Sequence, residues 1–158
     1  MKGSAFLAPL TLDFAESLFA DFEAFITRLP DAGMTVVLFE FVSFHKLLSI
    51  PQQSTSFANR GAYGNLMFGP GWNDPANDEV CREWTRVMAK KARVELERRV
   101  KSEAKDDNTK GAVGEYGNYD SLNESSQTLF GKNAPRLAEL KMRYDPGNLF
   151  KKGPRVLE

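Results

Sequence analysis

The sequence contains few of the residues that build metal and disulfide sites. Its 158 residues include one cysteine, Cys81, and one histidine, His45. A single cysteine excludes an internal disulfide and a zinc site made of cysteines. We interpret Cys81 as a small apolar residue of a helix rather than a reactive thiol, and we expect no metal site in this chain.

Charge of one sign and long apolar runs are also missing. Lys and Arg together number 21, as do Asp and Glu, so the formal net charge is zero. This balance gives no electrostatic reason to expect nucleic acid or an anionic membrane as a partner. No apolar run approaches the ~18 residues of a membrane-spanning helix, and the apolar start of the chain lacks a signal-peptide cleavage site. We therefore expect a single cytoplasmic domain over residues 1–158.

Hydrophobic residues make up 42% of the chain, and their spacing predicts the elements around a core. Residues 4–10 and 61–69 have the composition of strands. Residues 34–48, with the run TVVLFEFVSF, predict a further strand that is central in its sheet. Apolar steps of three and four predict helices that begin at residue 11 or 13 and at residue 78. The buried stripe expected on the second helix consists of Val80, Trp84, Val87, Met88 and Val94, with Ala92 at its edge.

The last third of the chain predicts another strand at residues 112–119 and a helix at residues 133–143. The whole order of strands and helices predicts an α+β fold, a mostly antiparallel sheet with helices packed on one face. No internal repeat and no domain boundary is visible.

The end of the chain carries a dense pattern of residues. Residues 133–150 read N-x-x-R-L-x-x-L-K-x-R-Y-D-P-x-N-L-F. Asp145-Pro146-Gly147 predicts a tight turn, because proline fixes φ and glycine tolerates a positive φ. Leu149 and Phe150 are then expected to fold back on the preceding helix, which gives this pattern a structural role.

This pattern is similar to the closing motif of berberine-bridge-like oxidases, N-x-x-R-L-x-x-V-K-x-K-Y-D-P-x-N-x-F. Residues 116–119, Y-G-N-Y, resemble the Y-x-N-Y segment of the same family. Residues 60–72 resemble a strand of the family that ends aromatic-x-x-x-Trp, here Phe68 and Trp72. From about residue 35 to residue 150, the chain thus resembles the C-terminal, substrate-side region of berberine-bridge-enzyme-like FAD-linked oxidoreductases.

The resemblance implies a surface that faces a substrate. In the family, the Y-x-N-Y segment lies along the flavin and the substrate, and one of its tyrosines can transfer a proton. Carried over, this makes Tyr116 a candidate catalytic residue and Asn118 and Tyr119 candidate substrate ligands. On a strand, Tyr116 and Asn118 would point one way and Tyr119 the other, unless the chain turns there. The alternative is an aromatic strand that only packs on helices.

The strand at residues 60–72 departs from the family at Met67, where relatives often carry Glu or Gln as a base or substrate ligand. A thioether takes no proton at neutral pH, so the resemblance implies a more apolar pocket here. We assign Met67 and Asn65 to substrate binding. Arg60 either binds an acidic group of the substrate or forms a surface ion pair.

Three further candidate site residues, Glu40, Phe41 and His45, lie within the expected central strand at residues 34–48. Glu40 is either a paired or edge carboxylate or an acid–base group whose pKa is raised by its apolar surroundings. His45 is a candidate catalytic residue or a hydrogen-bonded histidine, and Phe41 is assigned to substrate binding. Strict alternation separates Glu40 from His45, so both reach one cavity only if the strand bends or ends before His45.

The family implies FAD, held by glycine-rich loops of a domain N-terminal to this region and usually attached through His, often also Cys. Neither His45 nor Cys81 lies in a matching attachment motif, so we expect no cofactor bound by this chain, although full-length relatives carry FAD. The short length is then either natural or the result of truncation.

Three functions are compatible with this reading. The one we favour is a cofactor-free tailoring enzyme of secondary metabolism, which isomerises, dehydrates or cyclises a small hydrophobic metabolite. The second is the C-terminal part of a FAD-dependent oxidoreductase that needs a separate flavin-binding domain, and the third is a non-catalytic binding module. Because a large apolar sheet face is seldom left bare, we also expect a homodimer formed through that face.

Overall fold

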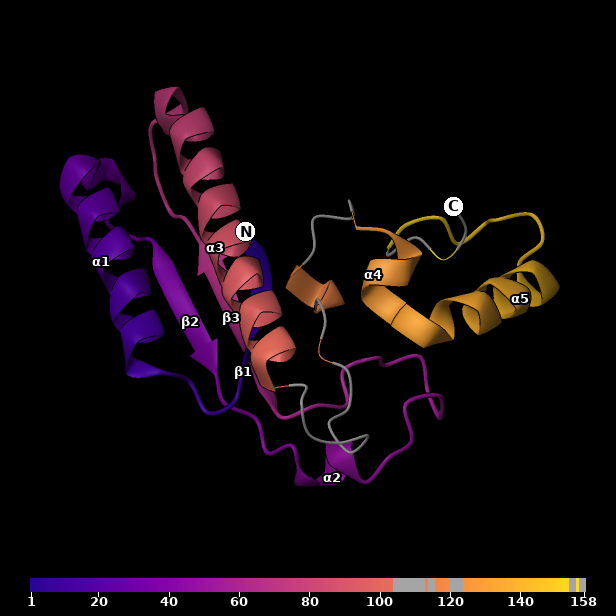
Figure 1. Cartoon of the computed structure of the whole chain (residues 1–158). Coiled ribbons are helices and arrows are strands. Elements are labelled where there is room, and N and C mark those ends of the chain that lie inside the picture. The colour runs from indigo at the N-terminus through magenta and orange to yellow at the C-terminus, as the bar shows by residue number, and fades with distance from the viewer. Residues whose placement is uncertain (104–112, 114–115, 120–123, 154–155, 157–158) are drawn as a thin grey trace.

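The computed structural model describes residues 1–103, 113, 116–119, 124–153 and 156. Its centre is an antiparallel sheet of three strands, β1 (Lys2–Leu7), β2 (Val36–Glu40) and β3 (Tyr63–Gly69), in the order β1-β3-β2. Two long helices pack against this sheet, α1 (Leu12–Arg28) and α3 (Asp78–Glu103), with α1 beside β2 and α3 beside β3 and β1 (Figure 1). The predicted α+β class, an antiparallel sheet with helices packed on it, is confirmed.

The core lies between the helices and one face of the sheet. Its largest fully buried side chains include Phe68 and Leu66 of β3 and Leu18 of α1. Trp84 of α3 stacks on Phe25 of α1, with ring centroids 4.5 Å apart, and therefore joins the two helices. A hydrogen bond also connects the two helices, because the Lys91 ammonium of α3 donates to the backbone oxygen of Ser17 in α1 at 3.0 Å.

The strand predicted as central is in fact an edge strand. β2 pairs with β3 alone, ends at Glu40, and is followed by the short helix α2 (His45–Leu48). The central strand is β3, which pairs on both sides and is buried at nearly every position. The apolar run in β2 misled the prediction because part of it is exposed rather than buried, with Val36 51% and Leu38 42% accessible.

The predicted buried stripe of α3 is also partly wrong. Trp84 and Met88 are buried, whereas Val80, Val87 and Val94 are exposed. The buried row instead follows steps of three and four through Cys81, Trp84, Met88, Ala92 and Leu96. Cys81, Met88 and Ala92, rather than the three valines, thus face the sheet and let the helix approach it.

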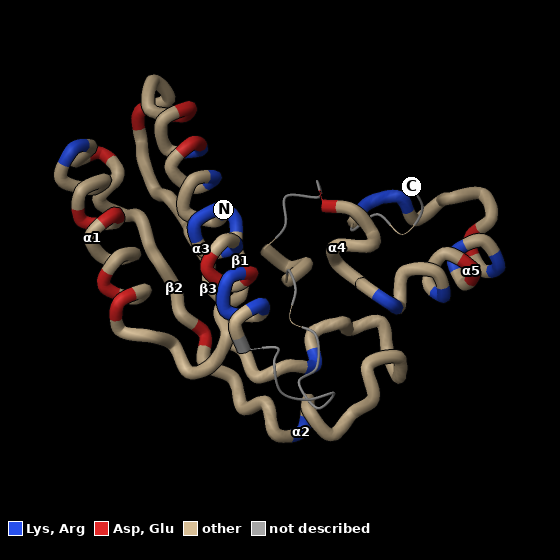
Figure 2. Tube along the Cα trace, viewed as in Figure 1, with Lys and Arg blue, Asp and Glu red and all other residues tan. Residues whose placement is uncertain are grey.

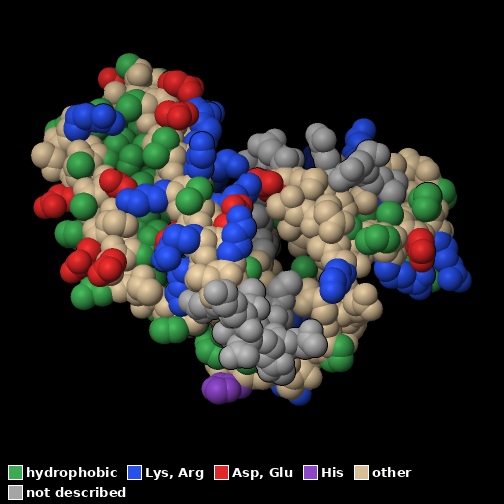
Figure 3. Space-filling view, viewed as in Figure 1, with side chains coloured by type: hydrophobic (Ala, Val, Ile, Leu, Met, Phe, Trp, Pro, Cys, Tyr) green, Lys and Arg blue, Asp and Glu red, His purple; other side chains and the backbone are tan. Residues whose placement is uncertain are grey.

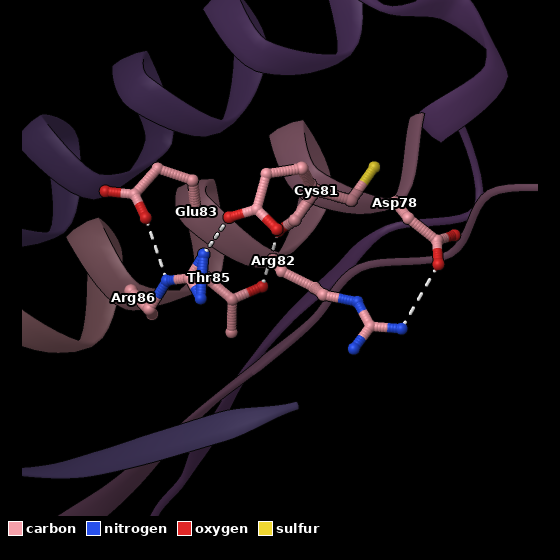
Figure 4. A network of polar contacts seen from close by, with 7 residues as sticks. Asp78, Cys81, Arg82, Glu83, Thr85 and Arg86 are labelled. Atoms are coloured by element: carbon pink, nitrogen blue, oxygen red, sulfur yellow. Dashed lines mark hydrogen bonds and ion pairs between the residues drawn. The ribbon is translucent and has the colours of Figure 1, made fainter. Parts of the chain in front are cut away.

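The solvent side of the first turns of α3 carries a chain of ion pairs. Arg86 lies between Glu79 and Glu83, with 2.8 Å to Glu83, and Arg82 reaches Asp78 at 3.2 Å (Figure 4). All of these side chains are well exposed, so each pair adds little stability. Along α3, blue and red residues alternate on the tube (Figure 2), as expected for a solvated face. None of the described helices is long and apolar enough to cross a membrane.

The C-terminal part forms a second group of helices beside the sheet (Figure 1). It contains the 3-10 turn η3 (Gly117–Tyr119), the helix α4 (Ser126–Phe130), the 3-10 turn η4 (Gly131–Asn133) and the helix α5 (Ala134–Tyr144), while two further 3-10 turns, η1 (Pro30–Ala32) and η2 (Pro75–Asn77), lie earlier in the chain. The predicted strand at residues 112–119 is contradicted at its end, because the amide of Tyr119 closes a tight turn onto the Tyr116 carbonyl at 2.9 Å. Residues 112, 114 and 115 of that prediction lie outside the described residues.

Asp145 organises the predicted turn after α5. Its carboxylate accepts the backbone N–H groups of Leu149 at 2.7 Å and Phe150 at 3.1 Å, and it pairs with Lys141. The side chains of Leu149 and Phe150 are 82% and 81% exposed, so they do not fold back on the helix as predicted. The positive φ falls on Asn148, at 49°, rather than on glycine, because asparagine also tolerates the left-handed region.

This turn gives a first testable prediction. The Lys141 ammonium, together with the two backbone N–H groups, holds the pKa of Asp145 below its usual value. A lowered pKa contributes stability above the unfolded-state pKa near 3.8, and that contribution is lost as the pH falls through the folded-state value. Asp145→Asn should therefore weaken the turn at neutral pH and remove its acid sensitivity. Amide hydrogen exchange at Leu149 and Phe150 should be about tenfold faster in the variant, and unchanged exchange would contradict the assignment.

Candidate functional site

The sheet face opposite the long helices carries the candidate site. Antiparallel pairing brings Gly3 of β1 and Leu38 of β2 to either side of Met67, and sets Glu40 opposite Asn65. Directly paired residues share a face, so these side chains all lie on this one. The turn η3 packs over β1 on the same face, because the Cβ of Tyr119 lies against Gly3.

Glu40 is the centre of a polar cluster on this face. The Asn65 side-chain amide donates to the Glu40 carboxylate at 3.1 Å, and the Tyr119 hydroxyl hydrogen-bonds the same carboxylate. The hydrogen bond to Glu40, followed by burial and the charge of Glu40, raises the pKa of Tyr119 to about 12. Tyr119 is therefore held protonated as a hydrogen-bond donor, and the Glu40 carboxylate accepts that hydrogen bond.

One acceptor in this cluster has no partner. Because the Asn65 nitrogen is committed to Glu40, its Oδ1 atom points elsewhere, and that oxygen is buried with no hydrogen bond. A buried polar atom without a partner is costly and calls for an explanation such as an unfilled ligand contact. The cluster thus combines a carboxylate, a phenol and a spare acceptor.

Tyr116 and Asn118 form a second polar pair next to this cluster. The Asn118 amide donates to the Tyr116 phenol oxygen at 2.8 Å, which leaves the hydroxyl proton of Tyr116 available to another acceptor. The rings of Tyr116 and Tyr119 meet edge to face, with centroids 5.1 Å apart. Because the chain turns at η3, the two tyrosines lie together, whereas a straight strand would have separated them.

A cavity of about 170 Å³ opens beside this pair. Its polar wall is formed by Tyr116, Asn118 and the neighbouring Asn59, and its apolar wall by Phe57, Leu129 and Phe130. The cavity therefore joins the loop before β3, the turn η3 and the helix α4, and in Figure 3 the surface is hollowed between the sheet and the C-terminal helices. An engineered cavity of about 150 Å³ holds benzene, so one ring of a ligand fits here.

Arg60 lies close to this region but inside the protein. It is only 5% exposed, its guanidinium donates to the Thr55 hydroxyl at 2.5 Å, and it covers the Phe57 ring at 5.4 Å. Its buried Nε has no hydrogen-bond partner. Of the two readings left open for Arg60, the surface ion pair is wrong, because Arg60 is buried and no carboxylate among the described residues pairs with it. Binding of an acidic substrate group stays a prediction.

Two predicted site residues lie elsewhere. His45 begins α2, is exposed, and has its ring beside Phe44, 5.7 Å away. Phe41 is 71% exposed and contacts Phe6 at 5.5 Å, and Phe6 belongs to the core on the helix side of the sheet. The structure thus brings together Glu40, Asn65, Met67, Tyr116, Asn118 and Tyr119, and does not bring His45 or Phe41 to them.

Sequence reasoning missed Tyr63 and the apolar wall. Tyr63 precedes Asn65 and Met67 at steps of two along β3, so strand alternation alone would have placed it on this face. Burial, and then the neighbouring Tyr116, raise the pKa of its phenol, against an opposing effect of Arg60. No sequence signal connected Phe57 to Leu129 and Phe130, which line one cavity only because of the tertiary packing. Within the described part of the chain, no group of His, Cys, Asp or Glu is arranged to hold a metal ion.

The close packing of Tyr119 on Gly3 supports a second prediction. A Cβ at residue 3 would lie 2.4 Å from the Cβ of Tyr119 and 2.7 Å from the Leu66 backbone oxygen. Gly3→Ala should therefore push Tyr119 away from Glu40 and cost about 1–3 kcal/mol of unfolding free energy, measured by urea denaturation. Gly147→Ala, where nothing lies within 4 Å, is the matched control and should be close to neutral. Equal stability of the two variants would contradict this packing.

Comparison with known proteins relates part of the chain to a family. Residues 115–153, which contain η3, α4 and the Asp145 turn, match the family described as berberine and berberine like. The chain is related to berberine-bridge-like FAD-linked oxidoreductases. This confirms the resemblance that the three sequence motifs predicted.

Two relatives show what share of a full-length protein the chain covers. It is 30% identical over 115 residues to the FAD-linked oxidoreductase pgmH of Aspergillus terreus, covering 70% of this chain and 23% of that protein. It is 29% identical over 119 residues to the aclacinomycin-N/aclacinomycin-A oxidase of Streptomyces galilaeus, covering 67% of this chain and 20% of that protein. The matched region thus spans about a fifth of these relatives. No solved structure matches the chain.

The glycines of the sheet do not fit the phosphate-binding part of a FAD site. Phosphates need glycines whose backbone is open to the ligand, and the sheet glycines are filled from within. The Tyr119 ring lies against Gly3, and a Cβ at Gly64 would lie 2.2 Å from the Phe6 ring. Phe57, Leu129 and Phe130 offer instead an apolar wall for a ring. The cavity wall therefore suits a ring, whereas Gly3 and Gly64 of the sheet offer no open backbone to a phosphate.

Proposed function

We propose that the chain forms the substrate-side wall of a FAD-linked oxidoreductase and binds a small, hydroxylated cyclic metabolite. The observation that carries this is the cavity of about 170 Å³, whose walls Tyr116, Asn118, Leu129 and Phe130 all belong to the matched region 115–153. The Streptomyces relative is named as an oxidase of aclacinomycin. That name supports a natural-product substrate for this chain, without choosing which one.

The residues divide the work of binding and proton handling. The apolar wall excludes water from one ring of the ligand, while the Tyr116 hydroxyl donates to a ligand oxygen and the Asn118 amide oxygen accepts a ligand hydroxyl. Behind them, Glu40 holds Tyr119 protonated, so that Glu40 is the proton acceptor and Tyr119 the donor of an acid–base pair. Met67 lines the same face without taking part in proton transfer.

Binding of a matched pair of ligands tests this proposal. 2-Naphthol carries the hydroxyl proton and 2-methoxynaphthalene lacks it, so the proposal expects the wild-type protein to bind 2-naphthol more tightly. Tyr116→Phe should weaken 2-naphthol binding about 5–10-fold, since one hydrogen bond contributes about 1 kcal/mol, as measured by fluorescence titration. Tyr144→Phe, on a tyrosine 71% exposed at the end of α5, is the control and should leave the Kd unchanged. Equal binding by the Tyr116→Phe and wild-type proteins would refute the site.

The same site favours a second candidate, the cofactor-free tailoring enzyme. Its supporting observation is that the acid–base pair Tyr119–Glu40 is formed wholly by this chain, and proton transfer alone suffices for isomerisation or dehydration. A visible spectrum of the purified protein, before and after titration with FAD, is combined with an activity assay that contains no flavin. A flavin absorption band that stays with the protein contradicts the second candidate, while conversion of a metabolite by the colourless protein without added FAD favours it.

A further inference from the structure

Exposed apolar side chains gather on and around β2. The strand and its flanks expose Met34 (79%), Val36 (51%), Leu38 (42%), Phe41 (71%) and Val42 (38%). At the other edge of the sheet, α3 packs along β1, and Ser4, Ala5 and Phe6 are at most 3% exposed. The two edges of one sheet therefore differ, since α3 covers one and no described element pairs with the other.

The open edge also lacks the features that keep edge strands apart. Natural edges are protected by lysine, proline, a bulge or an inward-pointing charge. Residues 35–42, TVVLFEFV, contain no lysine and no proline, and the strand pairs with β3 without a bulge. Its one charge, Glu40, is held by Asn65 and Tyr119 of the same chain. Figure 2 shows β2 without charge colour until its end.

A second copy of the chain suits this edge for a geometric reason. Two antiparallel edges related by a twofold axis are self-complementary, because the same strand supplies the donors and the acceptors on both sides. An axis through Leu38 pairs all five residues of β2, with Val37 opposite the partner's Phe39. An axis through Glu40 would set two carboxylates against each other, which is unfavourable.

We propose that two copies of this chain pair through β2, about a twofold axis at Leu38, to form a continuous six-stranded sheet. This dimer differs from the expected one, because it forms through the open edge of the sheet rather than through its face, and it does not depend on the proposed function. The pairing sets Leu38 opposite the partner's Leu38 and Glu40 opposite the partner's Val36. Directly opposed side chains lie on the same face at ~4.5–5.5 Å between Cβ atoms, so the partner would supply an apolar wall to the Glu40 cluster.

Single-cysteine cross-linking tests both the dimer and its register. Cys81 is buried, so Leu38→Cys adds one accessible thiol that faces its own copy. Dibromobimane, which fluoresces when it joins two thiols, should cross-link Leu38→Cys into a covalent dimer. Val94→Cys, at a valine 56% exposed on α3, is the control and should stay monomeric on a denaturing gel. Equal cross-linking of the two variants would overturn the register.

Light scattering tests the assembly without a cross-linker. The wild-type protein should have the mass of a dimer at high concentration. Leu38→Lys places two ammonium groups together at the axis and should give a monomer with an unchanged circular dichroism spectrum, because Leu38 is outside the core. A monomeric wild-type protein, or a Leu38→Lys protein that remains a dimer, would each overturn the proposal.

Discussion

Replacing Glu40 by glutamine should lower the pKa of Tyr119 from about 12 toward its usual value of 10.0. The carboxylate raises this pKa by accepting the phenol proton and by repelling the phenolate, and a neutral amide does neither as strongly. A return of two pK units corresponds to about a hundredfold change in the proton equilibrium of one side chain. The effect is the largest that a single substitution at the candidate site is expected to produce.

The measurement is an ultraviolet titration of tyrosine ionisation near 295 nm. Subtracting the curve of Tyr119→Phe from that of the parent isolates one phenol among the four tyrosines. Glu139→Gln is the control, because Glu139 is an exposed glutamate of α5 that pairs with Arg136 and lies outside the cluster. If Tyr119 already ionises near pH 10 in the wild-type protein, the pairing with Glu40 is absent and the acid–base assignment fails.

The same pair fixes the sign of the stability change at alkaline pH. Since the pKa of Tyr119 is raised on folding, its contribution is fully present below the unfolded-state pKa of 10.0 and is lost as the pH rises through about 12. The wild-type protein should therefore lose stability across this window. Glu40→Gln should show a smaller loss there, because the two states of Tyr119 then have similar pKa values.

Replacing Trp84 by alanine should reduce the unfolding free energy by about 3–5 kcal/mol, the range for large-to-alanine core substitutions. Trp84 is 8% exposed, stacks on Phe25 at 4.5 Å, and meets Phe68 edge to face at 6.4 Å. It therefore connects both long helices to the central strand. Urea unfolding followed by circular dichroism measures the loss.

Two further variants separate volume from polarity in this prediction. Val87→Ala, on the exposed side of α3, should change stability by less than about 0.5 kcal/mol. Trp84→Phe should fall between the two, because it keeps an aromatic ring and removes an indole N–H that is buried without a partner. A Trp84→Ala protein as stable as Val87→Ala would show that this packing is not the core.

Patterns that are local in the chain predicted the fold best. The spacing of Phe14, Leu18 and Phe25 predicted α1, because helical neighbours recur every three or four residues. The many motif positions within residues 133–150 predicted the family, and the turn at Asp145 follows from the backbone preferences of Asp-Pro-Gly. Such features depend on residues within one or two turns of each other, so no tertiary information is needed to find them.

Burial was predicted less well, because it depends on what packs against an element. An apolar edge strand and an apolar central strand have the same composition, which is why β2 was misplaced. Val80, Val87 and Val94 recur every seven residues, which is also the spacing of a buried helical stripe. Only the position of the sheet shows that Trp84 and Met88 face the core and that the three valines do not. His45 and Phe41 were assigned to the site for a similar reason, since the end of β2 at Glu40 could not be read from the run.

By itself, the sequence determined the relation to the family and the fold class and named most residues of the candidate site, because each is written in short patterns of residue type and spacing. Only the tertiary structure decided that Glu40 meets Tyr119 and that Phe57 and Leu129 line one cavity, since both arrangements join segments far apart in the chain. Their geometry depends on the register of β2 against β3 and on the turn at η3. Hydrogen bonds and cavities act over a few ångströms, and a linear pattern does not specify distances of that kind.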